Sequence, residues 1–194
     1  MKKILVMILA LTLAFSMFSC GSDEQLEPFK AAIAATDPAS VSVNVTLASS
    51  IGTLNSRFDT VYAEDGSFVL TYEYQEFNSA ASSATDGPIK TVSGTVNCDA
   101  NGNYSDGGAI AGQNAAATGL ALDLDNKDLE NYSVSADGKV LTVTIPADLS
   151  EAVLGVNVGQ DSTLVINLAG EKVSSFSLVY TTEQGKVTIL CAYN

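Results

Sequence analysis

The sequence predicts a mainly β domain of the α+β class, built as a curved antiparallel sheet or half-barrel meander of about eight or nine strands with two or three short helices. Three observations support this fold class. Apolar and polar residues alternate with a period of two in several segments of strand length, and turn dipeptides that contain glycine lie between these segments. A third is that only three segments carry helical signals. We therefore expect one sheet with few helices.

The alternating segments are predicted to be half-buried strands. They are residues 41–47, 68–74, 141–145, 164–168, 176–180 and 187–191. Between them lie residue pairs that accept a positive φ in tight hairpins, namely Asp65-Gly66, Asn101-Gly102, Asp137-Gly138, Gly170-Glu171 and Gln184-Gly185. Such short connections predict that neighbouring strands are antiparallel. Residues 75–88 and 155–162 are predicted to be loops.

Helical signals occur in three places. Leu26, Phe29 and Ile33 share one face at helical spacing near the start of the domain. Residues 146–155 begin with proline and end with glycine, which is the arrangement of a short helix. The alanine-rich residues 109–122 predict a third helix, weakened by two glycines. The element order is then one helix, about four strands, an insertion, two strands, a short helix and three strands.

The N-terminus resembles the export signal of a bacterial lipoprotein. Lys2 and Lys3 precede the apolar residues 4–18, a run shorter than the roughly 20 residues of a membrane-spanning helix. The sequence Met17-Phe18-Ser19-Cys20-Gly21 then resembles a lipobox, although Met17 and Phe18 stand where the family has leucine and a small residue. The resemblance implies cleavage before Cys20 and a covalent diacylglyceryl lipid on its sulfur.

This resemblance divides the chain into three parts. Residues 1–19 are expected to be the signal peptide, residues 20–25 an acidic tether, and residues 26–194 a single antiparallel β-rich domain. The lipid on Cys20 would hold the domain at the outer face of a membrane in the bacterial cell envelope, because two acyl chains bind a bilayer firmly. We therefore expect an extracytoplasmic protein whose first partner is the membrane.

Charge excludes one class of partner. The chain carries 9 basic and 22 acidic side chains, and loss of Lys2 and Lys3 would change its formal net charge from −13 to −15. Such a surface repels phosphate backbones, so nucleic acid is not an expected partner.

The predicted element order, together with the lipobox, resembles the LolA-like half-barrels of bacterial lipoproteins and lipid carriers. In that family a curved antiparallel sheet wraps around short helices and can enclose an apolar cavity. The resemblance implies a non-catalytic domain that binds an apolar ligand or an envelope component. A structural or protein-interaction module of the envelope is the alternative, and a hydrolase is a third hypothesis.

Catalytic motifs do not support an enzyme. The sequence contains no histidine, so it lacks the usual general base and the commonest zinc ligand. Gly107 and Gly112 have the spacing of a phosphate-binding loop, but Gln113 and Asn114 follow where lysine and serine or threonine are required. The 22 acidic residues make chance carboxylate pairs common, and no tryptophan is present to stack a sugar ring. We expect no catalytic residue and no cofactor other than the lipid.

Three further features remain open in the sequence. Asp99, Asn101, Asn103 and Asp106 are a weak calcium candidate, because no acidic residue follows where a calcium loop is closed; the simpler interpretation is a hairpin turn. Cys98 and Cys191 each share an alternation phase with apolar residues, which predicts either two buried thiols or one disulfide. The aromatic stripe of Phe68, Tyr72 and Tyr74 is interpreted as core, with a ligand-binding surface as the alternative.

Overall fold

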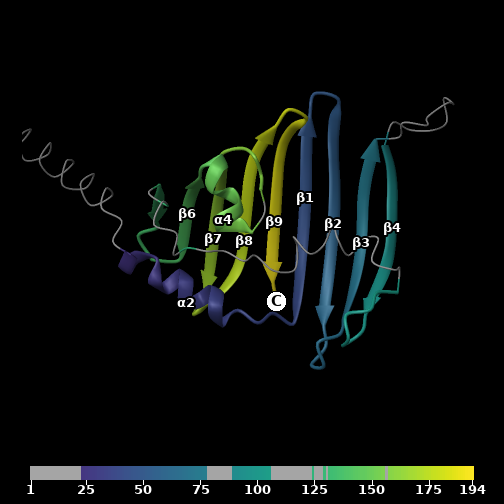
Figure 1. The fold of residues 1–194 in the computed structure, drawn as a ribbon, viewed down its shortest axis with the longest axis horizontal. Coiled ribbons are helices and arrows are strands. Elements are labelled where there is room, and N and C mark those ends of the chain that lie inside the picture. Colours follow the sequence, from purple (N-terminus) through teal and green to yellow (C-terminus); the bar gives the residue numbers. More distant parts are fainter. Residues whose placement is uncertain (1–22, 78–88, 106–123, 125–128, 130, 156) are drawn as a thin grey trace, which may run out of the picture.

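Among the residues that the structure describes, the chain forms one open antiparallel sheet of nine strands with two short α-helices (Figure 1). This computed structural model describes residues 23–77, 89–105, 124, 129, 131–155 and 157–194. The strands are β1 (Ser40–Ser49), β2 (Gly52–Tyr62), β3 (Phe68–Phe77), β4 (Ile89–Cys98), β5 (Tyr132–Val134), β6 (Val140–Ile145), β7 (Ser162–Ala169), β8 (Lys172–Thr182) and β9 (Gly185–Tyr193). The α-helices are α2 (Glu27–Ala35) and α4 (Ser150–Leu154), and the 3₁₀ helices η1 (Asp23–Gln25) and η2 (Ala147–Leu149) precede them. The predicted fold class and element order are confirmed.

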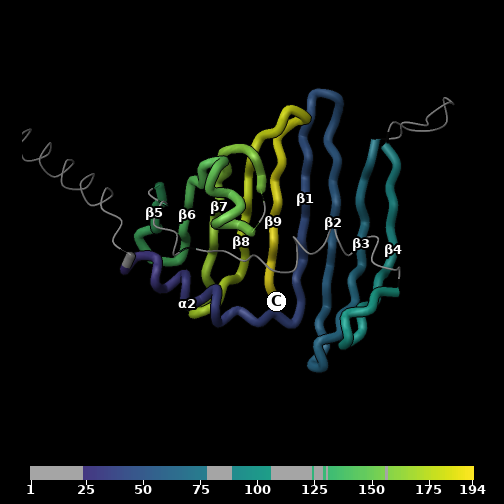
Figure 2. Tube along the Cα trace, viewed as in Figure 1, coloured from purple at the N-terminus to yellow at the C-terminus, as the bar shows by residue number. Residues whose placement is uncertain are grey.

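Two meanders make up the sheet (Figure 2). Strands β1 to β4 follow one another across one half and β5 to β9 across the other, in the spatial order β4-β3-β2-β1-β9-β8-β7-β6-β5. The two halves are joined where β1 pairs with β9, the last strand of the chain. The strands β4 and β5 are therefore the two edges of the sheet.

Some boundaries differ from those predicted. β3 continues to Phe77 and β7 begins at Ser162, so the predicted loops at 75–88 and 155–162 are wrong at these ends. The 3₁₀ helix η1 begins at Asp23, within the expected tether. β2 lies where the sequence pattern named no strand. The cause is that Ser56 and Thr60 alternate with Leu54 and Phe58 on the inward face, which breaks the apolar period.

The two faces of the sheet differ in character. One face, called the helix face here, carries a continuous row across eight strands in register: Leu141, Ile166, Phe176, Cys191, Val43, Phe58, Tyr72 and Gly94. The opposite face, called the open face, is rich in serine and threonine, as at Thr144, Thr163, Thr188 and Thr46. This difference follows from the alternation of side chains along each strand.

The helices cover the helix face over one half of the sheet. α2 packs against β7 and β8, with Phe29 fully buried and Pro28 in the first turn, where its missing N–H is tolerated. Thr36, which follows α2, accepts a hydrogen bond from the Val173 amide (3.0 Å) and so ties the helix to β8. α4 ends at Gly155, whose positive φ of 69° suits glycine.

The hydrophobic core lies beneath these helices. Most of its buried members come from α2, α4, β1 and β6 to β9, and they include Phe29, Val43, Leu141, Val153, Leu164, Ile166, Phe176 and Leu178. No buried member comes from β2, β3 or β4. The core described here therefore occupies one half of the helix face only.

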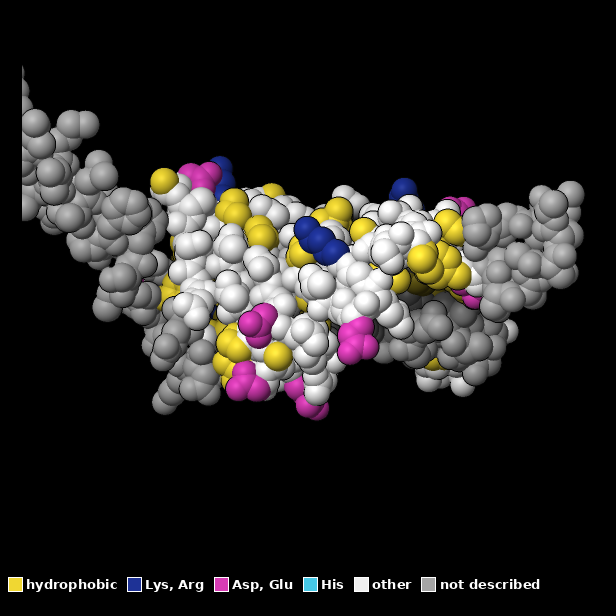
Figure 3. Space-filling model, turned by 90° about the horizontal axis from the view of Figure 1, so that it is seen from above, with side chains coloured by type: hydrophobic (Ala, Val, Ile, Leu, Met, Phe, Trp, Pro, Cys, Tyr) yellow, Lys and Arg dark blue, Asp and Glu magenta, His cyan; other side chains and the backbone are white. Residues whose placement is uncertain are grey.

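A separate buried group lies on the other half. Leu70, Val96 and Cys98 are buried, although they do not belong to the core. Beside them, the ring of Phe68 contacts Tyr62 (5.8 Å between centroids) and Tyr104 (6.0 Å). Seen from above (Figure 3), one group of hydrophobic side chains lies toward the end of the molecule where β3 and β4 stand, and others are scattered over the rest of the surface.

The two cysteines of the domain are free thiols. Cys98 lies on β4 and Cys191 on β9, both buried and both on the helix face. Three strands separate β4 from β9, and four strand spacings of about 4.8 Å amount to roughly 19 Å. A disulfide needs Cα atoms within about 7 Å. Of the two alternatives left open by the sequence, buried thiols are therefore correct.

Candidate functional site

The half of the helix face formed by β1 to β4 carries a set of half-buried aromatic rings. Phe58, Tyr72 and Tyr74 come from β2 and β3, and the register places Phe58 beside Tyr72. The rings of Tyr72 and Tyr74 lie 6.0 Å apart with an interplanar angle of 24°. We call these three residues, together with Val92 and Gly94 of β4, the aromatic platform.

Gly94 determines how the Tyr72 ring lies. A Cβ atom added at Gly94 would stand 2.7 Å from Tyr72 Cζ, closer than real contacts allow. The Tyr72 ring therefore lies across the Gly94 backbone on the neighbouring strand, filling the place of a side chain. Glycine weakens a strand interior and often marks a position where another group approaches closely.

Aliphatic side chains extend the platform toward the centre of the sheet. Val45 and Leu47 of β1 and Leu54 of β2 share the same face, and all three are half-buried. At the far end, the Lys90 ammonium lies 3.3 Å from the Glu76 carboxylate, so the two charges compensate each other. Together these residues form a half-buried apolar surface on this half of the helix face.

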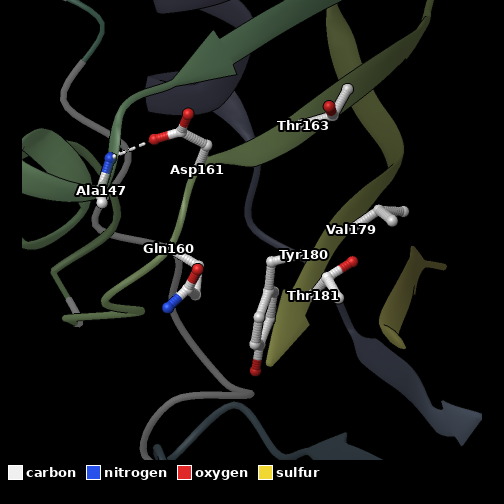
Figure 4. Close-up of a pocket in the computed structure, with 7 residues that line it drawn as sticks. All are labelled: Ala147, Gln160, Asp161, Thr163, Val179, Tyr180 and Thr181. Atoms are coloured by element: carbon white, nitrogen blue, oxygen red, sulfur yellow. Dashed lines mark hydrogen bonds between the residues drawn. The ribbon is translucent and has the colours of Figure 1, made fainter. Parts of the chain in front are cut away.

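The structure also contains a polar pocket of about 420 Å³ beside the start of β7 (Figure 4). It is lined by Ala147, Gln160, Asp161, Thr163, Val179, Tyr180 and Thr181. The Asp161 carboxylate is already engaged, since it accepts a hydrogen bond from the Ala147 amide (3.0 Å). Burial raises the pKa of the Tyr180 hydroxyl, so this group stays neutral. The polar lining does not match the apolar ligand expected from the sequence.

The calcium candidate forms a tight turn after β4. One oxygen of the Asp99 carboxylate accepts hydrogen bonds from the backbone amides of Asn101 and Asn103, each at 2.9 Å. The Asn103 side-chain nitrogen lies 2.9 Å from the other oxygen. Hydrogen bonds from Asn103 hold the pKa of Asp99 below its ordinary value. N–H donors thus occupy the carboxylate, as in a hairpin turn.

The remaining predicted site residues cannot be placed. Asp106 and Cys20 lie outside the described residues, as does the predicted helix at 109–122. Over the described ranges, no group of three or more cysteine, aspartate and glutamate side chains could hold a metal ion. Within those ranges, too, no helix is both long and apolar enough to cross a membrane. The calcium site and the lipidated cysteine stay predictions.

Sequence reasoning named Tyr72 and Tyr74 but interpreted them as core. It missed Phe58 and Gly94 altogether. A signal for both was present. Phe58 shares its alternation phase with Leu54 and Thr60, which is the pattern of a strand with one inward face. Gly94 interrupts an otherwise alternating strand. What the pattern could not show is that these residues come side by side through the register of three strands.

Comparisons with known proteins leave the chain without a family. No family model and no curated protein matches it. Among solved structures, LprF from Mycobacterium bovis aligns with 16% identity over 88% of this chain and 92% of that chain, with a TM-score of 0.42. A redesigned β barrel aligns with 15% identity over 84% and 96% of the two chains, with a TM-score of 0.22. These similarities are too weak to carry a function over to this chain.

Proposed function

We propose that this chain is a lipid-anchored protein of the bacterial cell envelope whose extracytoplasmic domain binds an apolar ligand without catalysing a reaction. The observation that carries the proposal is the aromatic platform, where the Tyr72 ring covers Gly94 and lies beside Tyr74 and Phe58. The lipid anchor rests on the resemblance of the sequence around Cys20 to a lipobox.

The energetics of the platform favour an apolar ligand. Removing apolar surface from water contributes about 25 cal/mol per Å², so covering roughly 200 Å² of it would contribute about 5 kcal/mol before the costs of association. The platform has no net charge, since Lys90 is paired with Glu76 at its end. An acyl chain or another uncharged apolar group fits this surface better than a charged metabolite does.

A matched pair of variants tests the site. Gly94→Val adds a branched side chain where Tyr72 now lies and must displace its ring. Ser93→Val adds the same branch one residue earlier, on the exposed open face. We expect Gly94→Val to lower affinity for a fluorescent fatty acid at least tenfold, which is about 1.4 kcal/mol, and Ser93→Val to leave it unchanged.

Native mass spectrometry supplies the second readout. The parent protein, incubated with a lipid extract of bacterial envelopes, is expected to retain a bound lipid that Gly94→Val loses. Far-ultraviolet circular dichroism of both variants verifies that the sheet persists. A parent that takes up neither the fatty acid nor any lipid contradicts the proposed ligand class.

The anchor is tested separately. Cys20→Ser removes the sulfur to which the lipid would be attached, so we expect growing cells to incorporate labelled fatty acid into the parent chain only. Equal labelling of both chains would contradict lipidation at Cys20. Because the anchor and the platform lie in different parts of the chain, one proposal can fail while the other holds.

A further inference from the structure

The two edges of the sheet are unequal. β5 has 3 residues, whereas β4 has 10, and among the described residues only the turn of residues 99–105 pairs with the outer side of β4. Proteins protect an exposed edge with a short strand, proline, a bulge or central charges, since an unprotected edge pairs with another strand. β5 is protected by its shortness. β4 has no proline, pairs with β3 without a register shift, and carries no charge between Thr91 and Asn97.

The backbone of Asn97 shows which groups of β4 point outward. Its N–H donates to Ser105 Oγ (3.0 Å), and its carbonyl accepts from the Ser105 amide (2.9 Å), so both groups point away from β3. Backbone groups of every second residue point to the same side of an antiparallel strand. Thr91, Ser93 and Thr95 therefore also present their N–H and C=O groups at the free edge.

The free stretch has defined limits. Beyond Asn97 the turn of residues 99–105 closes the edge, through the contact of Asn97 with Ser105 and the bridge between Cys98 and Tyr104. No other described residue pairs with the outer side of the stretch 90–96, whose central residue is Ser93. Its outward-facing members Thr91, Ser93 and Thr95 are all exposed.

We propose that this edge is a homodimerisation site at which β4 pairs antiparallel with β4 of a second copy, around a two-fold axis at Ser93. In this register Ser93 lies opposite its own equivalent, Thr91 lies opposite Thr95, and the three pairs exchange two backbone hydrogen bonds each. Val92 lies opposite Gly94 on the helix face. The two nine-stranded sheets then join into one.

The distribution of charge along β4 favours a second copy as the occupant, because the two-fold register keeps the like charges of the two copies apart. The acidic chain repels itself in general, with a formal net charge of −13. The stretch 91–97, however, is uncharged, and Lys90 lies opposite Val96 in the proposed register. The two Lys90 residues are then six positions apart along the strand direction, about 20 Å. No like charges face each other across the junction.

The contact is expected to be weak. One strand edge buries less than the roughly 800 Å² per partner of a standard interface. We therefore expect a concentration-dependent equilibrium between monomer and dimer rather than an obligate dimer. The proposal does not rest on ligand binding, because backbone groups at the edge of β4 form the junction, although Val92 and Gly94 of the aromatic platform lie on this strand.

Charge substitutions at Ser93 test the register. Ser93 pairs with Glu73 of β3 on the open face, so Ser93→Lys gains an opposite charge beside it in the monomer. In the dimer, the two introduced lysines would face each other about 5.5 Å apart between Cα atoms. Thr71→Lys is the control, because it adds the same charge to the same face one strand inward.

The full-length chain is measured in detergent by analytical ultracentrifugation from low micromolar to near-millimolar concentration, with the detergent mass subtracted. We expect the parent and Thr71→Lys to approach the mass of a dimer, and both Ser93→Lys and Ser93→Asp to remain monomeric. An equimolar mixture of Ser93→Lys and Ser93→Asp should regain the dimer. Amide exchange should show that Thr91, Ser93 and Thr95 become protected as the parent dimerises.

Three results would overturn the proposal. One is a parent that stays monomeric throughout. Another is a dimer that Ser93→Lys leaves intact or that the mixed charge variants fail to restore, since either places the contact elsewhere. The third is protection of these amides without a rise in mass, which would mean that the edge is occupied by something other than a second copy.

Discussion

Two buried serines, one at the start of α4 and one at the start of β7, provide a stringent test of the structure, because the same substitution should have opposite effects on them. Ser150 and Ser162 are 0% and 2% exposed. The Ser150 hydroxyl donates to the Ala147 carbonyl (2.8 Å) and accepts from the Val158 amide (3.1 Å). The Ser162 hydroxyl has no hydrogen-bond partner among the described residues.

The expected magnitudes follow from these contacts. A buried polar group without a partner costs about 1–3 kcal/mol, and Ser162→Ala removes that cost. The substitution leaves a void of roughly 15 Å³, which at about 24 cal/mol per Å³ costs roughly 0.4 kcal/mol. We expect Ser162→Ala to raise the free energy of unfolding by about 1–2 kcal/mol.

Ser150→Ala should act in the opposite direction. It removes two hydrogen bonds worth about 1 kcal/mol each and leaves the Val158 amide without its partner. We therefore expect a loss of about 2 kcal/mol. For a chain of this size, each 1 kcal/mol corresponds to a shift of roughly 2–4 °C in Tm.

The assay is equilibrium urea unfolding followed by far-ultraviolet circular dichroism, with the unfolding slope compared between variants. An unchanged slope indicates that the midpoint reports stability alone. Destabilisation by Ser162→Ala would refute the reasoning, since the hydroxyl would then have a partner. A neutral Ser150→Ala would refute the role of its two hydrogen bonds.

Three further predictions address the core, a buried thiol and the turns. Phe29→Ala should lower the free energy of unfolding by about 3–5 kcal/mol, because this fully buried ring anchors α2 to the sheet. Urea unfolding measures this loss, and a change below about 1 kcal/mol would contradict the packing. Burial raises the pKa of the Cys191 thiol to about 11, so a maleimide at neutral pH should label this thiol only after denaturation. Peptide mass spectrometry locates the label. Rapid labelling of Cys191 in the native protein would contradict its burial. Hydrogen bonds hold the pKa values of Asp65, Asp99 and Asp137 below the ordinary value of 3.8. The stability that these carboxylates contribute to the fold should therefore be present above pH 3.8 and be lost as the pH falls through their pKa values in the folded protein. Replacing all three with asparagine should flatten the fall of the urea midpoint in acid, and an unchanged pH profile would count against these turns as its source.

Local sequence patterns predicted most of the fold. Alternation along residues 41–47 and 68–74 identified strands because a strand with one buried face must repeat every second residue. Glycines at the predicted turns adopt positive φ, as at Gly66 and Gly138, where other residues would be strained. The helix near the N-terminus followed from Leu26 and Phe29, which are both buried. Each of these signals depends on neighbours within a few positions.

The candidate site was less predictable. Tyr72 and Tyr74 were visible in the sequence, but their exposure depends on whether another element covers them. The role of Gly94 depends on its pairing with Tyr72 in the neighbouring strand. A serine at this position would fit the local alternation pattern equally well. The roles of Ser150 and Ser162 differ only through contacts with residues elsewhere in the chain.

By itself, the sequence determined that this chain forms an antiparallel sheet with few helices and located six of its nine strands, because backbone periodicity and turn conformation are local properties. Only the tertiary structure decided that β1 pairs with β9 across almost the whole chain. That pairing sets the strand order, leaves β4 as a long free edge, and concentrates the helices over the opposite half of the sheet. Contacts between distant residues form because apolar surface is buried cooperatively across the entire fold, and no short stretch of residues encodes which distant strand becomes its neighbour.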